Sequence, residues 1–163
     1  MEVYSVVKQN LLSKFEQIRN RMILVIDQLT DDQVNWRPNK ESNSIANLIV
    51  HIEGNIQERI SSKILGEPNK RNRDQEFDEN IDRTKEELKE AISKSFQLII
   101  NSLSTMTEAD MLKVISIKNT DYTVLDIFLM STSHFSEHLG QILYIAKTLL
   151  DEQYVTTSIP KKR

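Results

Sequence analysis

The chain has 163 residues, a formal net charge of −3 and no cysteine, which predicts one domain with a single hydrophobic core. The slight acidic excess gives no general attraction to nucleic acid, and the lack of cysteine excludes disulfides, thiolate metal ligands and a cysteine nucleophile. The N-terminus does not resemble a signal peptide and no apolar run reaches the ~20 residues that cross a bilayer, so we expect a cytoplasmic protein without membrane or nucleic-acid partners.

The first predicted helix covers roughly residues 3–28. Its apolar positions alternate steps of four and three, which is typical of a helix that packs in a bundle at a shallow angle. These positions are Leu11, Phe15, Ile18, Met22, Val25 and Leu29. Asp31, Asp32 and Pro38 then indicate a loop.

A second helix is expected to be capped by Ser42 or Asn43 and to end at Gly66. Its apolar stripe consists of Ile45, Leu48, Ile52, Ile56 and Ile60. Residues 67–80 are charged and almost free of apolar side chains, so they predict an exposed connection in which Phe77 is the one anchor.

The third predicted helix begins at Thr84, because Thr84 and Glu87 have the spacing of a capping box. Its buried stripe is Leu88, Ile92, Phe96, Ile99 and Leu103. Residues 104–121 are predicted to be irregular, with a short strand-like or packed segment between Met111 and Ile117.

Thr123 and Asp126 form a second capping-box pattern and open the fourth helix, which runs to about Leu150. Four such helices predict an all-α four-helix bundle. The connections are longer than those of tight antiparallel neighbours, so up-down-up-down topology is not assumed. We assign residues 1–151 to the bundle and residues 152–163 to a polar, flexible C-terminal tail.

The three histidines are the main candidates for chemistry. His134 and His138 share one face of the fourth helix and continue its apolar line of Ile127 and Ile145. His51 lies at the border of the second helix's stripe, so three imidazoles can converge. Three nitrogen ligands hold a divalent metal and leave positions for water or substrate. Alternatively, the histidines are polar core residues with separate hydrogen-bond partners, and their spacing alone does not decide.

Two familiar kinds of metal site do not fit the pattern. Glu137 directly precedes His138, whereas in the zinc-protease pattern HExxH the glutamate follows the first histidine. Di-iron carboxylate sites need Glu-x-x-His pairs on two helices, which are absent here. Asn55, one turn after His51, and Gln141 are candidates for hydrogen bonds to a ligand histidine or to substrate. They are equally compatible with ordinary polar positions at a core edge.

Several segments resemble the DinB-like superfamily. Residues 134–144, HFSEHLGQILY, are similar to its last-helix signature. Upstream, the Trp-Arg-Pro of residues 36–38 followed by residues 44–51 is similar to its second motif, in which a W-x-P loop leads into a helix with the first histidine. Residues 71–77 resemble a feature of one uncharacterised branch. The resemblance spans roughly residues 15–149.

The resemblance implies a four-helix bundle with one long crossover and one divalent metal ion (zinc, nickel, iron or manganese) held by His51, His134 and His138. Members are often homodimers. Characterised relatives act on small molecules as bacillithiol- or mycothiol-dependent S-transferases, a mycothiol-dependent isomerase and metal-dependent hydrolases. The leading hypothesis is therefore an enzyme that joins a low-molecular-weight thiol to an electrophile. The alternatives are a metal-dependent hydrolase and a non-catalytic, stress-associated metal-binding helical protein.

Overall fold

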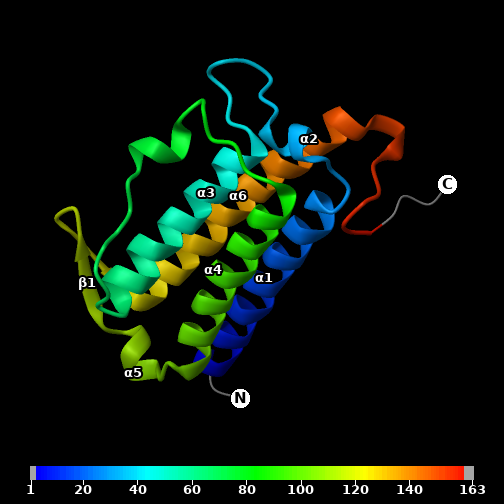
Figure 1. The fold of residues 1–163 in the computed structure, drawn as a ribbon. Coiled ribbons are helices and arrows are strands. Elements are labelled where there is room, and N and C mark those ends of the chain that lie inside the picture. The colour runs from blue at the N-terminus through cyan, green and yellow to red at the C-terminus, as the bar shows by residue number, and fades with distance from the viewer. Residues whose placement is uncertain (1–2, 160–163) are drawn as a thin grey trace.

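The computed structural model describes residues 3–159, in which four long helices form a bundle (Figure 1). The long helices are α1 (Val3–Ile26), α3 (Ile45–Ile56) with its π-helical extension η1 (Gln57–Ile64), α4 (Lys85–Thr105) and α6 (Val124–Leu150). The short elements are α2 (Asp31–Asn35), η2 (Asp74–Phe77), α5 (Glu108–Met111), β1 (Val114–Ile117), β2 (Thr120–Thr123) and η3 (Asp151–Gln153). The predicted all-α four-helix bundle is confirmed.

The bundle contains one long crossover between α3 and α4. Helices α1 and α3 each pack against both α4 and α6, and Figure 1 shows that α3 and α4 run in the same direction. Tyr4 donates to the carbonyl oxygen of Met106, while Lys85 Nζ donates to the carbonyl oxygen of Leu29 at the opposite end, so α1 is antiparallel to α4. The α3–α4 connection must therefore return along the bundle, and its element η2 contacts α3.

The core consists of the apolar stripes that the periodicity predicts. Every predicted stripe position in the first three helices is buried. Phe15 stands edge-on to Phe128, with ring centroids 6.3 Å apart, and Phe96 meets Phe135 at 5.7 Å. Burial of each such side chain contributes roughly 1.5 to 3 kcal/mol, and these contacts pack α1 and α4 against α6.

The helix starts follow the capping-box prediction at Thr84 and Thr123, but the second helix begins later than expected. Its N-cap is Ser44, whose hydroxyl accepts a hydrogen bond from the backbone N–H of Asn47 while the Asn47 side chain accepts from the backbone of Ser44. The predicted caps Ser42 and Asn43 are wrong, because the residues three positions after them are apolar and cannot return the bond.

Part of the segment between α4 and α6, predicted to be irregular, is ordered. It forms α5 and an antiparallel hairpin in which Ile117 pairs with Thr120. The turn residues Lys118 and Asn119 have φ values of 50° and 65°. Positive φ at both central residues is the mark of a type I′ turn, which matches the twist of the strands.

The predicted C-terminal tail contacts the bundle through Tyr154, Val155 and Thr157, whose hydroxyl accepts a hydrogen bond from Arg21 of α1 at 3.3 Å. Tyr154 packs against the core, and the Gln28 side chain exchanges two hydrogen bonds with the backbone of Val155. The last four positions of the tail, 160–163, lie outside the described residues. Between residues 3 and 159, no helix is long and apolar enough to cross a membrane.

Candidate metal centre

The three histidines come together where α3 faces α6. One ring nitrogen from each lies within 4.8 Å of the other two. His51 Nε2 is 3.0 Å from His134 Nε2. His51 is buried, and His134 and His138 are partly buried on one face of α6. The predicted convergence of the three imidazoles is therefore present in the fold.

A buried carboxylate orients the His51 ring. Glu76 Oε2, on the crossover, lies 2.8 Å from His51 Nδ1. An ionised carboxylate only accepts hydrogen bonds, so Nδ1 of the neutral ring carries the proton and donates. The lone pair of His51 is then on Nε2, the atom that faces His134. A carboxylate behind a histidine in this manner is the usual support for a metal ligand.

His138 is oriented in the same sense by Gln141. The Gln141 Oε1 atom lies 3.1 Å from His138 Nδ1, and an amide oxygen accepts, so Nδ1 of His138 donates. Its Nε2 therefore carries a lone pair. This nitrogen is buried and has no hydrogen-bond partner within residues 3–159. Gln141, a candidate for a hydrogen bond to a ligand histidine or to substrate, thus contacts the histidine three residues before it on α6.

One divalent cation would satisfy the three histidine rings better than hydrogen bonds between the rings do. A hydrogen bond between His51 and His134 would satisfy that pair but leave His138 Nε2 buried and unpaired, which costs about 1 to 3 kcal/mol. A cation takes a lone pair from each ring. Nitrogens bound to one tetrahedral zinc ion at about 2.1 Å lie about 3.4 Å apart, which is near the 3.0 Å between His51 Nε2 and His134 Nε2.

The electrostatic setting keeps the rings ready to accept a cation. Burial, together with the charges of His138 and His51, lowers the pKa of His134 to about 4. Burial also lowers the pKa of His51, even though its hydrogen bond to Glu76 acts in the opposite direction. Both rings are therefore neutral near pH 7, which is the form that binds metal.

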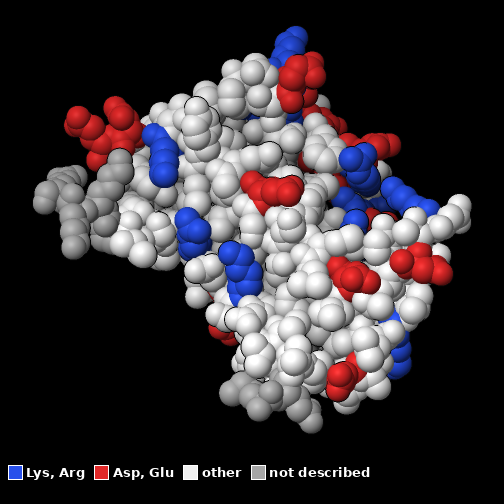
Figure 2. All heavy atoms as spheres, turned by 180° about the vertical axis from the view of Figure 1, so that it is seen from behind, with Lys and Arg blue, Asp and Glu red and all other residues white. Residues whose placement is uncertain are grey.

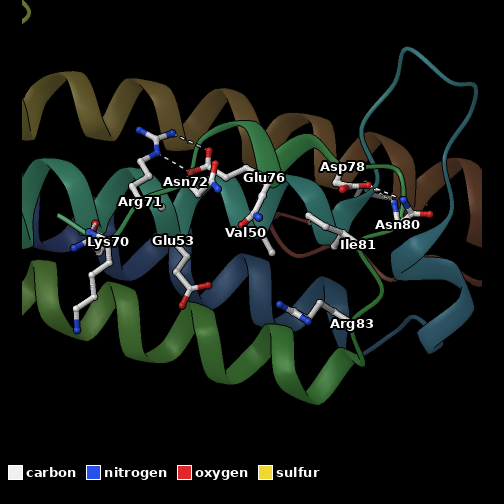
Figure 3. Close-up of a pocket in the computed structure, with 13 residues that line it drawn as sticks. Val50, Glu53, Lys70, Arg71, Asn72, Glu76, Asp78, Asn80, Ile81 and Arg83 are labelled. Carbon is white, nitrogen blue, oxygen red and sulfur yellow. Dashed lines mark hydrogen bonds and ion pairs between the residues drawn. The ribbon is translucent and has the colours of Figure 1, made fainter.

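Glu76 itself belongs to a buried ion-pair network. Arg71 donates from Nε to Glu76 Oε1 at 2.6 Å and from NH2 to Oε2 at 2.8 Å, and it also pairs with Glu58. Burial opposes ionisation of Glu76, but the hydrogen bonds from Arg71 and His51 outweigh it and hold its pKa below the ordinary value. Figure 3 shows Arg71 and Glu76 paired over α3.

The prediction that residues 67–80 form an exposed connection with Phe77 as their one anchor is therefore wrong at two positions. Glu76 is buried, and the Arg71 side chain is only 8% exposed. A charged segment can be buried where each charge finds a fixed partner, and here the partners are His51 and Glu58. Hydropathy alone does not detect this arrangement.

Gly54 makes room for the carboxylate. A Cβ atom at this position of α3 would lie 2.1 Å from Glu76 Oε1 and 2.9 Å from its Cδ. Only glycine permits this close approach, although glycine inside a helix costs roughly 0.5 to 1 kcal/mol relative to alanine. A glycine inside a helix, three residues after His51, was the one feature of the sequence that could have indicated another segment packed closely against α3.

Two polar residues clamp the crossover onto α3. Asn47, fully buried, donates from Nδ2 to the carbonyl oxygens of Glu76 and Asp78, each at 3.0 Å. Arg37 donates to the same Asp78 oxygen at 2.7 Å and to Asn47 Oδ1 at 2.7 Å. Arg37, from the loop between α1 and α3, thereby helps to fix the position along α3 at which Glu76 contacts His51.

A cavity of about 500 Å³ opens beside the histidines. His51, His134 and Asn55 contribute to its wall. Asn55, the other predicted hydrogen-bonding residue, is buried and its Oδ1 has no partner within the described chain. Asn55 therefore borders the cavity and makes no hydrogen bond to a ligand histidine within the described residues.

Comparison with known proteins places the chain in a family. A family model described as "Protein of unknown function (DUF1572)" matches residues 4–163. No curated protein matches the sequence.

Solved structures show the same fold. A DinB-like protein from Bacillus subtilis is similar with a TM-score of 0.68 and 17% identity, over 94% of this chain and 99% of that one. A conserved protein from Enterococcus faecalis is similar with a TM-score of 0.72 and 17% sequence identity, over 92% of this chain and 98% of that one. A DinB-like protein from Bacillus cereus is similar with a TM-score of 0.66 and 14% sequence identity, over 86% of this chain and 91% of that one. The predicted DinB-like topology is thus confirmed.

Proposed function

The chain belongs to the DUF1572 family of proteins of unknown function and has the DinB-like fold, and from this premise we propose that it is a divalent-metal-dependent enzyme. His51, His134 and His138 would hold the ion. The reaction that we propose joins a low-molecular-weight thiol to an electrophilic carbon.

One observation carries the proposal: three imidazole nitrogens converge on a point to which Glu76 and Gln141 direct lone pairs. Three protein ligands are the number found in catalytic zinc sites, whereas structural sites usually have four. The adjoining cavity of about 500 Å³ has room for a small substrate. Because the chain has no cysteine, a thiol nucleophile must come from the substrate.

A divalent cation held by His51, His134 and His138 would supply the positive charge that makes a thiolate available near neutral pH. The chain's own residues position the reactants. Glu76 fixes the His51 ring, and Asn55 contributes a polar side chain to the cavity wall. In the transfer, the thiol proton leaves to solvent, the S–C bond forms and the leaving group departs with its electron pair.

The test is thiol consumption by metal-reconstituted protein, measured with bacillithiol and other small thiols against a model electrophile. We expect His138→Ala to lower the catalysed rate at least about a hundredfold, because it removes one of three ligands. Glu137→Ala, an exposed change on the same helix, is the matched control and should keep the rate. The absence of turnover across the thiol panel, or an unchanged rate in His138→Ala, would reject the proposed reaction.

A further inference from the structure

The cavity beside the histidines has an unusual charge. Besides His51 and His134, its wall contains side chains from η1, from the crossover and from the β1–β2 turn. The charged ones are Glu58, Arg59, Arg71, Arg73 and Lys118. Figure 2 shows basic side chains gathered beside a hollow at the right of the molecule.

Only one of these four cations is neutralised. Arg71 pairs with the carboxylates of Glu58 and Glu76. Within residues 3–159, neither Arg59, Arg73 nor Lys118 takes part in an ion pair. Within the described residues, three positive charges therefore line the cavity without an ion-pair partner.

The positions of these cations are built into irregular backbone. Arg59 belongs to the π-helix η1, a rare conformation that is frequent at functional sites. Lys118 has a φ of 50°, a conformation that costs a non-glycine residue of the order of 1 kcal/mol. The Arg73 guanidinium lies 5.3 Å from the centre of the Phe77 ring, which restrains it at the rim.

A buried amide adds a polar group to the wall. Asn55 is 5% exposed, and its side-chain oxygen has no partner in the described chain. Since an amide can turn over and present its N–H₂ group instead, it can hydrogen-bond an acceptor or a donor. A buried amide without a protein partner at the cavity wall is a group with which a bound ligand can pair.

We propose that this cavity binds a carboxylate or phosphate group of the substrate, with Arg59, Arg73 and Lys118 as the cations that recognise it. The role of this anion as part of the substrate rests on the proposed metal-dependent function, but anion binding itself does not. An anionic group held here would place the remainder of the molecule beside His51 and His134, which line the same cavity.

Arg59 lines the same cavity as His51 and His134. A substrate anion between Arg59 and the imidazoles would therefore lie within the electrostatic reach of both.

The experiment is calorimetric titration of metal-free protein, in low salt near pH 7.5, with inorganic phosphate and separately with succinate. Metal-free protein excludes direct coordination of the anion by a cation. We expect at least one probe to bind with a dissociation constant on the order of 1 mM. The probe that binds more tightly identifies the anion class. The double variant Arg59→Gln with Lys118→Gln should raise the dissociation constant of that probe at least about tenfold, because charged hydrogen-bond donors are lost.

Arg83→Gln is the control for the loss of a single positive charge, since it lies beside a different cavity and should change binding less than about twofold. Lys118→Gln alone is a variant at an exposed turn, so it remains folded and should still weaken binding about threefold. Failure of both probes to bind, or equal binding by the double variant and wild type, would overturn the inference.

Metal content measured on the same samples separates the two proposals. A protein that takes up metal but binds neither probe contradicts the anion site and leaves the metal function intact. A protein that binds phosphate or succinate through these cations but takes up no metal supports the anion site and contradicts the proposed function.

Discussion

The two sides of the histidine centre are built in different ways. On one side, His134 and His138 are four residues apart on α6, and helix geometry alone gives them a common direction. On the other side, His51 is held by Glu76 from a segment 25 residues further along the chain. One side depends on local periodicity, and the other depends on a buried long-range ion pair.

This difference indicates where the centre is sensitive. On the α6 side, an exposed side chain such as that of Glu137 can be removed without loss of a hydrogen bond to either imidazole ring. The α3 side depends on several groups that must all be in place: Glu76, Arg71, Gly54 and the Arg37–Asn47 clamp. Changes to these residues should therefore affect metal affinity and stability together, although none of them is a ligand.

Glu76→Ala should have the largest effect among the supporting residues. It removes the acceptor for His51 Nδ1 and leaves Arg71 buried with Glu58 as its one remaining carboxylate. We expect a loss of about 3 kcal/mol in the free energy of unfolding and a metal affinity at least about tenfold lower. Denaturant unfolding and metal titration measure the two quantities.

The matched control is Glu137→Ala on α6, where the side chain is exposed. It should change stability by less than about 0.5 kcal/mol and leave metal affinity unaltered. Equal effects of the two substitutions would show that the α3 side has no special support.

Gly54→Ala should have the next largest effect. Its Cβ would overlap the Glu76 carboxylate, so the carboxylate must move away from His51. We expect a loss of about 1 to 3 kcal/mol and weaker metal binding. Gly140→Ala on α6 is the control, because no atom lies within 4 Å of a Cβ there, and it should raise stability by up to about 1 kcal/mol.

A double variant sharpens this result. If Gly54→Ala acts by displacing Glu76, then Gly54→Ala combined with Glu76→Ala should bind metal about as well as Glu76→Ala alone. Additive losses in metal affinity would mean that Gly54 serves the centre by another route.

Gln141→Ala should have the smallest effect. It removes the acceptor for His138 Nδ1, but Gln141 is exposed and water can take its place. We expect metal affinity to fall only about threefold, at the weak end for residues that support ligands, with unchanged helicity. A loss as large as that of Glu76→Ala would contradict the proposed asymmetry of the centre.

The sequence predicted the parts of the molecule that follow from local periodicity. The apolar stripes, the caps at Thr84 and Thr123 and the inward direction of His134 all depend on residues within one or two turns of each other. Such interactions are encoded within a single segment of sequence, so spacing alone is sufficient to predict them.

The support of His51 was not predictable in the same way. Residues 67–80 read as solvated because most of them are charged, and burial of Glu76 depends on Arg71 and His51 meeting it in space. The hairpin turn at Lys118 and Asn119 likewise lacks the glycine that usually indicates a type I′ turn. Gly54, near the C-terminal end of α3, was the available signal.

The most direct test of the central claim is the metal content of the protein purified without a histidine tag, measured by elemental analysis before and after reconstitution. We expect about one divalent ion per chain, as for a single three-ligand site, and the loss of this ion in His138→Ala with helicity retained. Less than about a tenth of an ion per chain after reconstitution, or full occupancy in His138→Ala, would contradict a metal centre formed by these three histidines.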